Sequence, residues 1–155
     1  MLYYLELETI VGKMRIIADE DAIVEIQFVR ENKSLGDAQR QETPLLLEAK
    51  RQLEEYFAGL RASFSLPLNP QGTEFQKKVW QQLEAIPFGE TRTYGQIAAA
   101  IGQPKASRAV GGANHNNPIA IMIPCHRVIG ANGKMVGYGG GVDIKEKLLQ
   151  LEGVK

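Results

Sequence analysis

The pattern of apolar residues changes in character at the segment PLNPQG, residues 67–72. Before it, short runs rich in β-branched and aromatic residues predict a meander of strands at residues 2–8, 14–19 and 22–29. Residues 43–59 then predict a helix on that sheet, because they carry a Thr N-cap, a Pro in the first turn and a helical apolar stripe. Beyond the segment, helical spacing predicts helices at residues 73–86, 93–102, 105–115 and 143–153.

The clustering of Pro, Asn and Gly between the two patterns is typical of a linker. We therefore predict an α+β protein of two parts. A small sheet-plus-helix domain takes residues 1–70, and a mainly helical domain takes residues 71–155.

Composition restricts the class of protein. The chain has 155 residues with one cysteine and two histidines, so it cannot form an internal disulfide, and zinc-type Cys/His spacing is absent. We expect a metal-free protein of a reducing compartment. The first residues alternate apolar and charged side chains instead of forming a secretory signal, and no segment reaches the length of a membrane span. These features favour a cytoplasmic protein without a membrane partner.

The charged residues are unevenly distributed. The formal net charge is zero, yet no Asp or Glu occurs between Thr91 and Val142. The basic residues of that stretch are Arg92, Lys105, Arg108, Arg127 and Lys134. A solvated basic surface is the ordinary interpretation of so few charges, and a surface that faces phosphates is the alternative.

The helices predicted at 93–102 and 105–115 are joined by a Gln-Pro pair, with small Ala98 where they would cross. This spacing is typical of a helix-turn-helix, although helix hairpins in ordinary cores share it. In the second helix Arg108 projects from a run of small residues, Ala106, Ser107, Ala109, Gly111 and Gly112. Since Gly inside a helix costs roughly 1 kcal/mol relative to Ala, two explanations stay open. The helix packs tightly on a neighbouring element, or it approaches a sugar-phosphate backbone in a contact largely indifferent to base sequence.

The single cysteine, Cys125, lies in IPCHRVIG, residues 123–130, directly before His126. A lone cysteine beside an apolar run is usually an inert core residue. Adjacency to His126 does not by itself activate it, because consecutive side chains of an extended segment point to opposite faces. A nucleophile would need a turn at this point or a bridging water, and a third group to orient the imidazole.

Five motifs follow one another within residues 73–153: FGETRTYGQIA, SRAVGGANHNNP, IPCHRVIG, GYGGG and KEKLLQLEG. In order and spacing they resemble the O6-alkylguanine-DNA alkyltransferases, also called methylated-DNA–protein-cysteine methyltransferases. Residues 1–70 resemble the N-terminal domain of that family only in length and in strand-then-helix order. The resemblance implies a ribonuclease H-like first domain and a winged-helix-like second domain. It also implies DNA repair by irreversible, single-turnover transfer of the alkyl group from O6-alkylguanine to the protein's own cysteine, with O4-alkylthymine left open as a substrate.

The resemblance also implies roles for individual residues. Cys125 looks like the alkyl acceptor, and His126 looks like the base that deprotonates it through a water. Glu152 matches the carboxylate that orients the histidine, and Asn117 matches the asparagine that braces the active-site turn. Tyr94 looks like the residue that crowds the phosphate of the flipped nucleotide and assists protonation of the leaving guanine.

Other positions resemble the DNA-contacting and substrate-binding parts of the family. Arg108 looks like the finger that fills the stack vacated by the base, with Thr93 and the small residues of the second helix beside the DNA. The implied substrate pocket comprises Val136, Gly137, Tyr138, Gly139 and Gly140. Many relatives have a small hydroxyl residue where this chain has Gly139, so backbone amides would have to serve the substrate oxygen instead.

The implied partner is double-stranded DNA containing O6-alkylguanine, bound by a monomer without any cofactor or metal. Two other functions are compatible with parts of the pattern. A module that only binds alkylated bases would lack the cysteine, whereas PCHR is intact here. A cysteine hydrolase could use Cys125 and His126, but would leave the smooth helix and Arg108 without a purpose.

Overall fold

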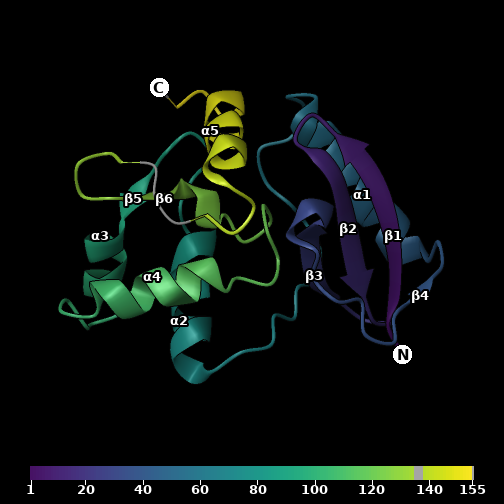
Figure 1. Ribbon diagram of the computed structural model, residues 1–155, viewed down its shortest axis with the longest axis horizontal. Helices are drawn as coiled ribbons and strands as arrows, with labels where there is room; N and C mark the ends of the chain where they lie inside the picture. Colours follow the sequence, from purple (N-terminus) through teal and green to yellow (C-terminus); the bar gives the residue numbers. More distant parts are fainter. Residues whose placement is uncertain (135–137, 155) are drawn as a thin grey trace. The chain divides into compact units, whose positions relative to one another are not determined.

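The computed structural model describes residues 1–134 and 138–154 (Figure 1). The chain forms two compact units, Met1–Pro70 and Gln71–Lys155. Each unit has its own apolar core. None of the helices in the described residues is long and apolar enough to cross a membrane.

The N-terminal unit is built on a four-stranded sheet in the order β3-β2-β1-β4. Its strands are β1 (Tyr3–Thr9), β2 (Gly12–Ala18), β3 (Ile23–Phe28) and β4 (Gln39–Arg40). The first three form the predicted antiparallel meander, whereas β4 joins β1 in parallel. The tight β1–β2 turn uses Gly12 at a φ of 97°, a conformation that a side chain would strain.

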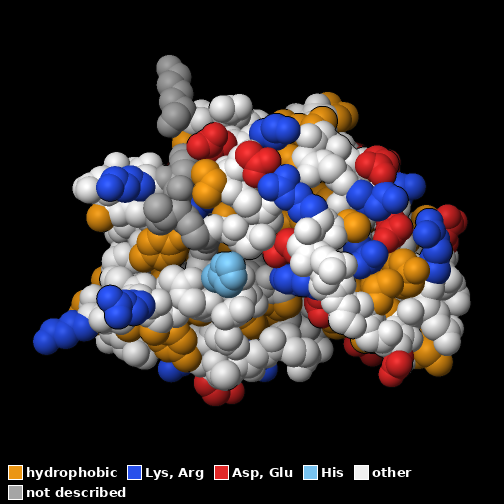
Figure 2. Space-filling model, viewed as in Figure 1, with side chains coloured by type: hydrophobic (Ala, Val, Ile, Leu, Met, Phe, Trp, Pro, Cys, Tyr) orange, Lys and Arg blue, Asp and Glu red, His pale blue; other side chains and the backbone are white. Residues whose placement is uncertain are grey.

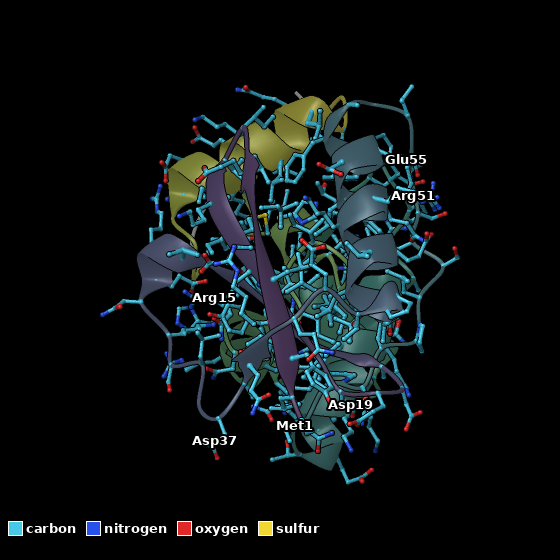
Figure 3. All side chains as sticks on the ribbon, turned by 90° about the vertical axis from the view of Figure 1, so that its right-hand side faces the viewer. Met1, Arg15, Asp19, Asp37, Arg51 and Glu55 are labelled. Atoms are coloured by element: carbon cyan, nitrogen blue, oxygen red, sulfur yellow. The ribbon has the colours of Figure 1, made fainter. Side chains whose placement is uncertain are left out.

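One helix covers a face of this sheet. Helix α1 (Pro44–Phe57) begins where the Thr43 hydroxyl accepts a hydrogen bond from the Leu46 N–H. Its buried face packs on β1 and β2, while Arg51 and Glu55 lie together on its exposed side (Figure 3). A short 3₁₀ turn, η1 (Val29–Glu31), follows β3.

The C-terminal unit is mainly helical. Its helices are α2 (Glu74–Glu84), α3 (Tyr94–Ala100), α4 (Ser107–His115) and α5 (Val142–Leu151). Helices α2, α3 and α4 lie against one another (Figure 1), and Trp80, Ile97 and Val110 on them are buried. The Trp80 indole N–H donates to the Ala113 carbonyl over 2.9 Å, which ties α2 to α4.

Two two-residue strands complete this unit. Strand β5 (Arg92–Thr93) pairs in parallel with β6 (Val128–Ile129). The 3₁₀ turn η2 (Cys125–Arg127) leads directly into β6, so the pairing holds the cysteine segment beside the start of α3. Neither these strands nor β4 is predictable from periodicity, because two residues carry no alternating pattern.

Candidate active site

Cys125 and His126 lie on a turn and not on an extended strand. In η2 the Arg127 N–H donates to the Pro124 carbonyl over 3.0 Å, and the Cys125 N–H donates to the Ile123 carbonyl over 2.8 Å. Both side chains are buried, with exposed fractions of 6% for Cys125 and 0% for His126. The turn removes the alternation that would send them to opposite faces of a strand.

Asn117 organises the chain that leads into this turn. Its Nδ2 donates to the Ile123 carbonyl over 2.7 Å, and its Oδ1 accepts from the Ile119 N–H over 3.0 Å. Within the loop so closed, Ile121 has a φ of 72°, which is unfavourable for a β-branched residue. The buried Asn117 amide therefore holds a strained loop directly before the cysteine.

His126 is paired with a carboxylate from the end of α5. The His126 Nε2–H donates to Glu152 Oε2 over 2.7 Å, and both side chains are fully buried. A carboxylate only accepts, so this bond places the imidazole proton on Nε2 and leaves the lone pair on Nδ1. Burial lowers the pKa of His126 below its usual 6.5 despite the opposing influence of Glu152, so the imidazole is neutral at pH 7. Nδ1 is buried and has no hydrogen-bond partner among the described residues.

Arg127 holds the same carboxylate from its other side. Its Nε donates to Glu152 Oε1 over 2.7 Å and its Nη2 donates to Oε2 over 3.0 Å, in the bidentate geometry that suits a guanidinium. Its Nη1 donates to the Ile86 carbonyl over 2.7 Å, and the guanidinium lies 5.8 Å from the centre of the Phe88 ring. These bonds fix the orientation in which the Glu152 carboxylate accepts from the imidazole.

The Cys125 thiol lies among groups with opposing effects on its ionisation. Burial raises the pKa of the thiol, while hydrogen bonds from Asn117 and Tyr138 and the charge of Lys145 lower it. Lys145 is itself buried on α5, donates from Nζ to the Val128 carbonyl, and has a pKa lowered by burial to about 8. Burial likewise raises the pKa of Tyr94, with a further contribution from Cys125, so its phenol stays protonated.

The charges of this buried cluster do not cancel while the thiol is protonated. Arg127 and Lys145 are cations, Glu152 is an anion and His126 is neutral, which leaves one excess positive charge beside Cys125. A thiolate would balance it. The arrangement therefore keeps a protonated thiol at rest and favours its anion once the proton has a place to go.

The residues expected to face DNA lie on α4 and directly before α3. Thr93 caps α3 in a reciprocal bond with Gln96, and Ala106 begins α4 without a side-chain cap. Arg108, Ala109 and Gly112 are exposed, whereas Ala106, Ser107 and Gly111 are partly covered. On the face seen in Figure 2, basic side chains without acidic neighbours lie over α3 and α4.

Of the expected pocket residues, Tyr138 and Gly140 are buried and Gly139 is exposed. Val136 and Gly137 lie outside the described residues. In the parts of the chain that the structure describes, no group of three or more His, Cys, Asp or Glu is placed to hold a metal ion.

Comparisons with known proteins cover both units. The family model "6-O-methylguanine DNA methyltransferase, DNA binding domain" matches residues 74–154, and the model "6-O-methylguanine DNA methyltransferase, ribonuclease-like domain" matches residues 2–70. The chain belongs to this methyltransferase family. The α+β fold and the family resemblance expected from the sequence are confirmed.

Individual members of the family align over almost the whole chain. The methylated-DNA–protein-cysteine methyltransferase of Methanosarcina acetivorans is 54% identical, with 98% of this chain and 99% of that protein covered. The constitutive enzyme of Bacillus subtilis is 50% identical, with 98% and 96% covered. The crystal structure of Mycobacterium tuberculosis OGT in complex with DNA has a TM-score of 0.92 and 43% identity, covering 97% of this chain and 92% of that one.

Three residues of the methyltransferase site were missed by the sequence analysis: Arg127, Lys145 and Asn114. The burial of Lys145 could have been predicted from the sequence, because the residue lies beside Ile144 and one turn before Leu148 on the apolar stripe of α5. Arg127 was considered only as one of the basic charges. Its pairing with Glu152 joins residues 25 positions apart, and no local pattern shows this.

Proposed function

We propose that this methyltransferase repairs duplex DNA by transferring an alkyl group from O6 of guanine to Sγ of Cys125. The observation that carries the proposal is the buried pair of His126, on the same turn as the cysteine, and Glu152 at the end of α5. One side of the imidazole is bonded to the carboxylate, and the other side, Nδ1, is left as a base. A structural cysteine would need none of these groups.

The chemical step needs only these residues and one water. The thiol proton passes through the water to His126 Nδ1, and the thiolate is stabilised by the excess positive charge of the cluster. The sulfur–carbon bond then forms as the carbon–O6 bond breaks, and the bonding electron pair leaves with the guanine. Tyr94 supplies a proton to the guanine, and exchange with water returns the proton of His126 to Tyr94. The net result is a thioether and unmodified guanine, and each molecule acts once because thiol exchange does not cleave a thioether.

Access to O6 requires the base to leave the duplex, because O6 is paired inside it. We assign this task to α3 and α4. Their surface carries the exposed Arg108, and the uncapped first turn of α4 presents backbone N–H groups that suit a phosphate. Arg108 fills the gap in the stack, so that insertion offsets the cost of a few kcal/mol for unstacking.

The two glycines of α4 support a contact with DNA. A Cβ at Gly112 would meet nothing within 4 Å, and one at Gly111 would meet the Tyr94 ring at an ordinary 3.9 Å. Neither glycine has the positive φ that would require it. Packing inside the protein therefore does not demand these residues, which supports our proposal that a DNA backbone approaches this face of α4.

We further propose that the protein acts as a cytoplasmic monomer, with residues 1–70 and 71–155 as its domains. The single cysteine supports a reducing compartment, and the division into Met1–Pro70 and Gln71–Lys155 supports the boundary.

Intact-protein mass spectrometry after incubation with duplex containing O6-methylguanine tests the function. We expect a gain of one CH₂ unit per molecule, located on the peptide that contains Cys125, with no second addition at excess DNA. Cys125→Ser should bind the damaged duplex and show no gain, because a hydroxyl is far less acidic than an activated thiol. Alkylation of the Ser variant to the same extent would disprove the assignment of the acceptor.

A further inference from the structure

His115 is the last residue of α4, and its side chain is exposed, whereas His126 is fully buried. The His115 ring is not needed to close the helix, because the N–H and the Nδ2 of Asn116 both donate to the Gly112 carbonyl over 3.0 Å. Among the described residues the His115 side chain forms no hydrogen bond and no ion pair. The imidazole is therefore available to a ligand.

His115 lies on the same side of α4 as Arg108. The two are seven positions apart, which is almost two complete turns of an α-helix and about 10 Å along its axis. The exposed Gly112 lies between them on this side. The opposite side of α4 faces the protein, where the buried Asn114 donates from Nδ2 to the Cys125 carbonyl over 3.3 Å. Arg108, Gly112 and His115 thus form one solvent-facing row.

No carboxylate is bonded to His115. The stretch from Thr91 to Val142, which includes all of α3 and α4, contains no Asp or Glu. The titratable and charged groups on the elements against α4 are Tyr94 on α3, Glu74, Lys77, Lys78 and Glu84 on α2, and the buried Cys125, His126 and Arg127 of η2. None of them pairs with His115 in the part of the chain that the structure describes. A protonated imidazole at this position is therefore complementary to an anion from outside the protein.

The duplex proposed to lie on α4 offers such an anion. The grooves of B-DNA are about 6 and 12 Å wide. On a helix that crosses the groove that Arg108 enters, a residue about 10 Å away lies beyond the groove wall, against the sugar-phosphate backbone. Histidine changes its charge between pH 5 and 8, and its cation donates a charge-assisted hydrogen bond to phosphate.

We propose that protonated His115 binds a phosphate of the duplex beside the groove that Arg108 enters, so that the affinity for DNA rises as the pH falls from 8 to 6. This inference rests on the proposed binding of duplex to α3 and α4, and it adds a contact whose charge depends on pH. It concerns the strength of binding and leaves the chemistry at Cys125 to His126.

The experiment measures the binding of a labelled, undamaged duplex by fluorescence anisotropy at pH 6.0 and 8.0, each over a series of salt concentrations. An undamaged duplex keeps alkyl transfer out of the measurement. Wild type should bind about three- to tenfold more tightly at pH 6.0, the effect of one charge-assisted contact. The logarithm of its affinity should also fall more steeply with the logarithm of the salt concentration at pH 6.0, by up to about 0.9 in slope for one neutralised phosphate.

Three variants assign this change to a residue. His115→Gln, which keeps a polar side chain that does not titrate, should show the shallower slope at both pH values. His115→Arg, a permanent cation, should show the steeper slope at both. Lys105→Gln is the matched control, because it removes a permanent charge from the exposed turn before α4 and should keep the wild-type difference between the two pH values.

A wild-type slope that is the same at both pH values would overturn the proposal. A pH-dependent slope retained by His115→Gln would also overturn it, because another group would then be titrating. If His115 only stabilises the end of α4, His115→Gln should lower the urea midpoint and leave the slopes of wild type in place, which counts against the proposal as well. Wild type that binds no duplex at either pH and gains no mass with O6-methylguanine would instead contradict the proposed function, so the two failures are distinguishable.

Discussion

The two units of this protein treat buried polar groups in opposite ways. The N-terminal unit buries Gln27 and Gln52, and neighbouring side chains or backbone satisfy both amides. Arg51 pairs with Glu48 and Glu55 on the exposed side of α1, and Arg15 pairs with Glu6 across β1 and β2 with side chains 14% and 17% exposed. Residues 1–70, all of which the structure describes, leave no buried side-chain polar atom without a partner.

The C-terminal unit instead buries charged groups together: Arg127, Lys145 and Glu152, with neutral His126 among them. Asn114 Oδ1 and His126 Nδ1 have no partner among its described residues. Such burial seldom increases stability, because desolvation offsets the attraction between the charges. The contrast indicates that the second unit accepts an energetic cost where it needs a base and an oriented carboxylate.

The largest effect should come from breaking the buried ion pair. Arg127→Met leaves Glu152 buried and uncompensated, so the free energy of unfolding should fall by about 3–5 kcal/mol. Arg51→Met, which removes an exposed pair on α1, should leave the unfolding midpoint almost unchanged. Urea unfolding followed by the fluorescence of Trp80, the only tryptophan, measures the C-terminal unit, and circular dichroism follows the whole chain. Equal losses in the two variants would remove the contrast between the units.

A second prediction concerns Arg108, the exposed cation of α4. If its guanidinium fills the vacated stack, Arg108→Ala should slow repair of duplex by one to two orders of magnitude, and Arg108→Lys should restore little because the planar group is lost. Reaction with free O6-benzylguanine, which has no stack to leave, should be nearly unaffected. If Arg108 only neutralises a phosphate, Lys should replace it and the salt dependence of binding should become shallower in Ala. Rates on the duplex and on the free base distinguish these outcomes.

The pH dependence of stability should follow His126. Burial holds its pKa below the usual 6.5 in the folded state, where Glu152, Arg127 and Lys145 face it. Between pH 6.5 and that lowered pKa, His126 is protonated in the unfolded chain and neutral in the folded protein. The contribution of His126 to stability is therefore complete above pH 6.5 and is lost as the pH falls. The Trp80 urea midpoint should therefore decrease from pH 7.5 to pH 5.5. A replacement that does not titrate, His126→Gln, should show a smaller decrease, and an identical decrease would exclude His126 as its source.

The smallest effects should come from substitutions of Gly112. A side chain at this position should not lower stability, yet a large one should weaken DNA binding. Gly112→Ala fills open space on a helix, so it should raise the free energy of unfolding by about 0.5–1 kcal/mol. Gly112→Leu should also fold, yet it should weaken binding to duplex because a side chain would hold the DNA backbone away. Fluorescence anisotropy with a labelled duplex measures this loss. Unimpaired binding by the Leu variant would show that the surface of α4 at Gly112 does not meet DNA.

Local features of the sequence were sufficient to predict most elements. Thr43 and Thr73 accept from the N–H groups three residues ahead, and α1 and α2 begin directly after them as expected. The meander and the four later helices lie where periodicity put them, with ends that differ by at most two residues. The short strands escaped prediction because their pairing depends on distant residues, as in the parallel contact of Arg92 with Val128.

For the site, the sequence by itself determined which residues carry the chemistry, because Cys125, His126 and Glu152 stand in motifs that resemble those of one family. Only the tertiary structure decided how they act. The 3₁₀ turn at Cys125 depends on a bond from Asn117 to Ile123, and the orientation of Glu152 depends on Arg127, which in turn reaches the Ile86 carbonyl 41 positions away. Such contacts join segments that are far apart along the chain, and they leave no periodic pattern in the sequence. Burial, charge balance and the unsatisfied atom of Asn114 arise only when those segments meet.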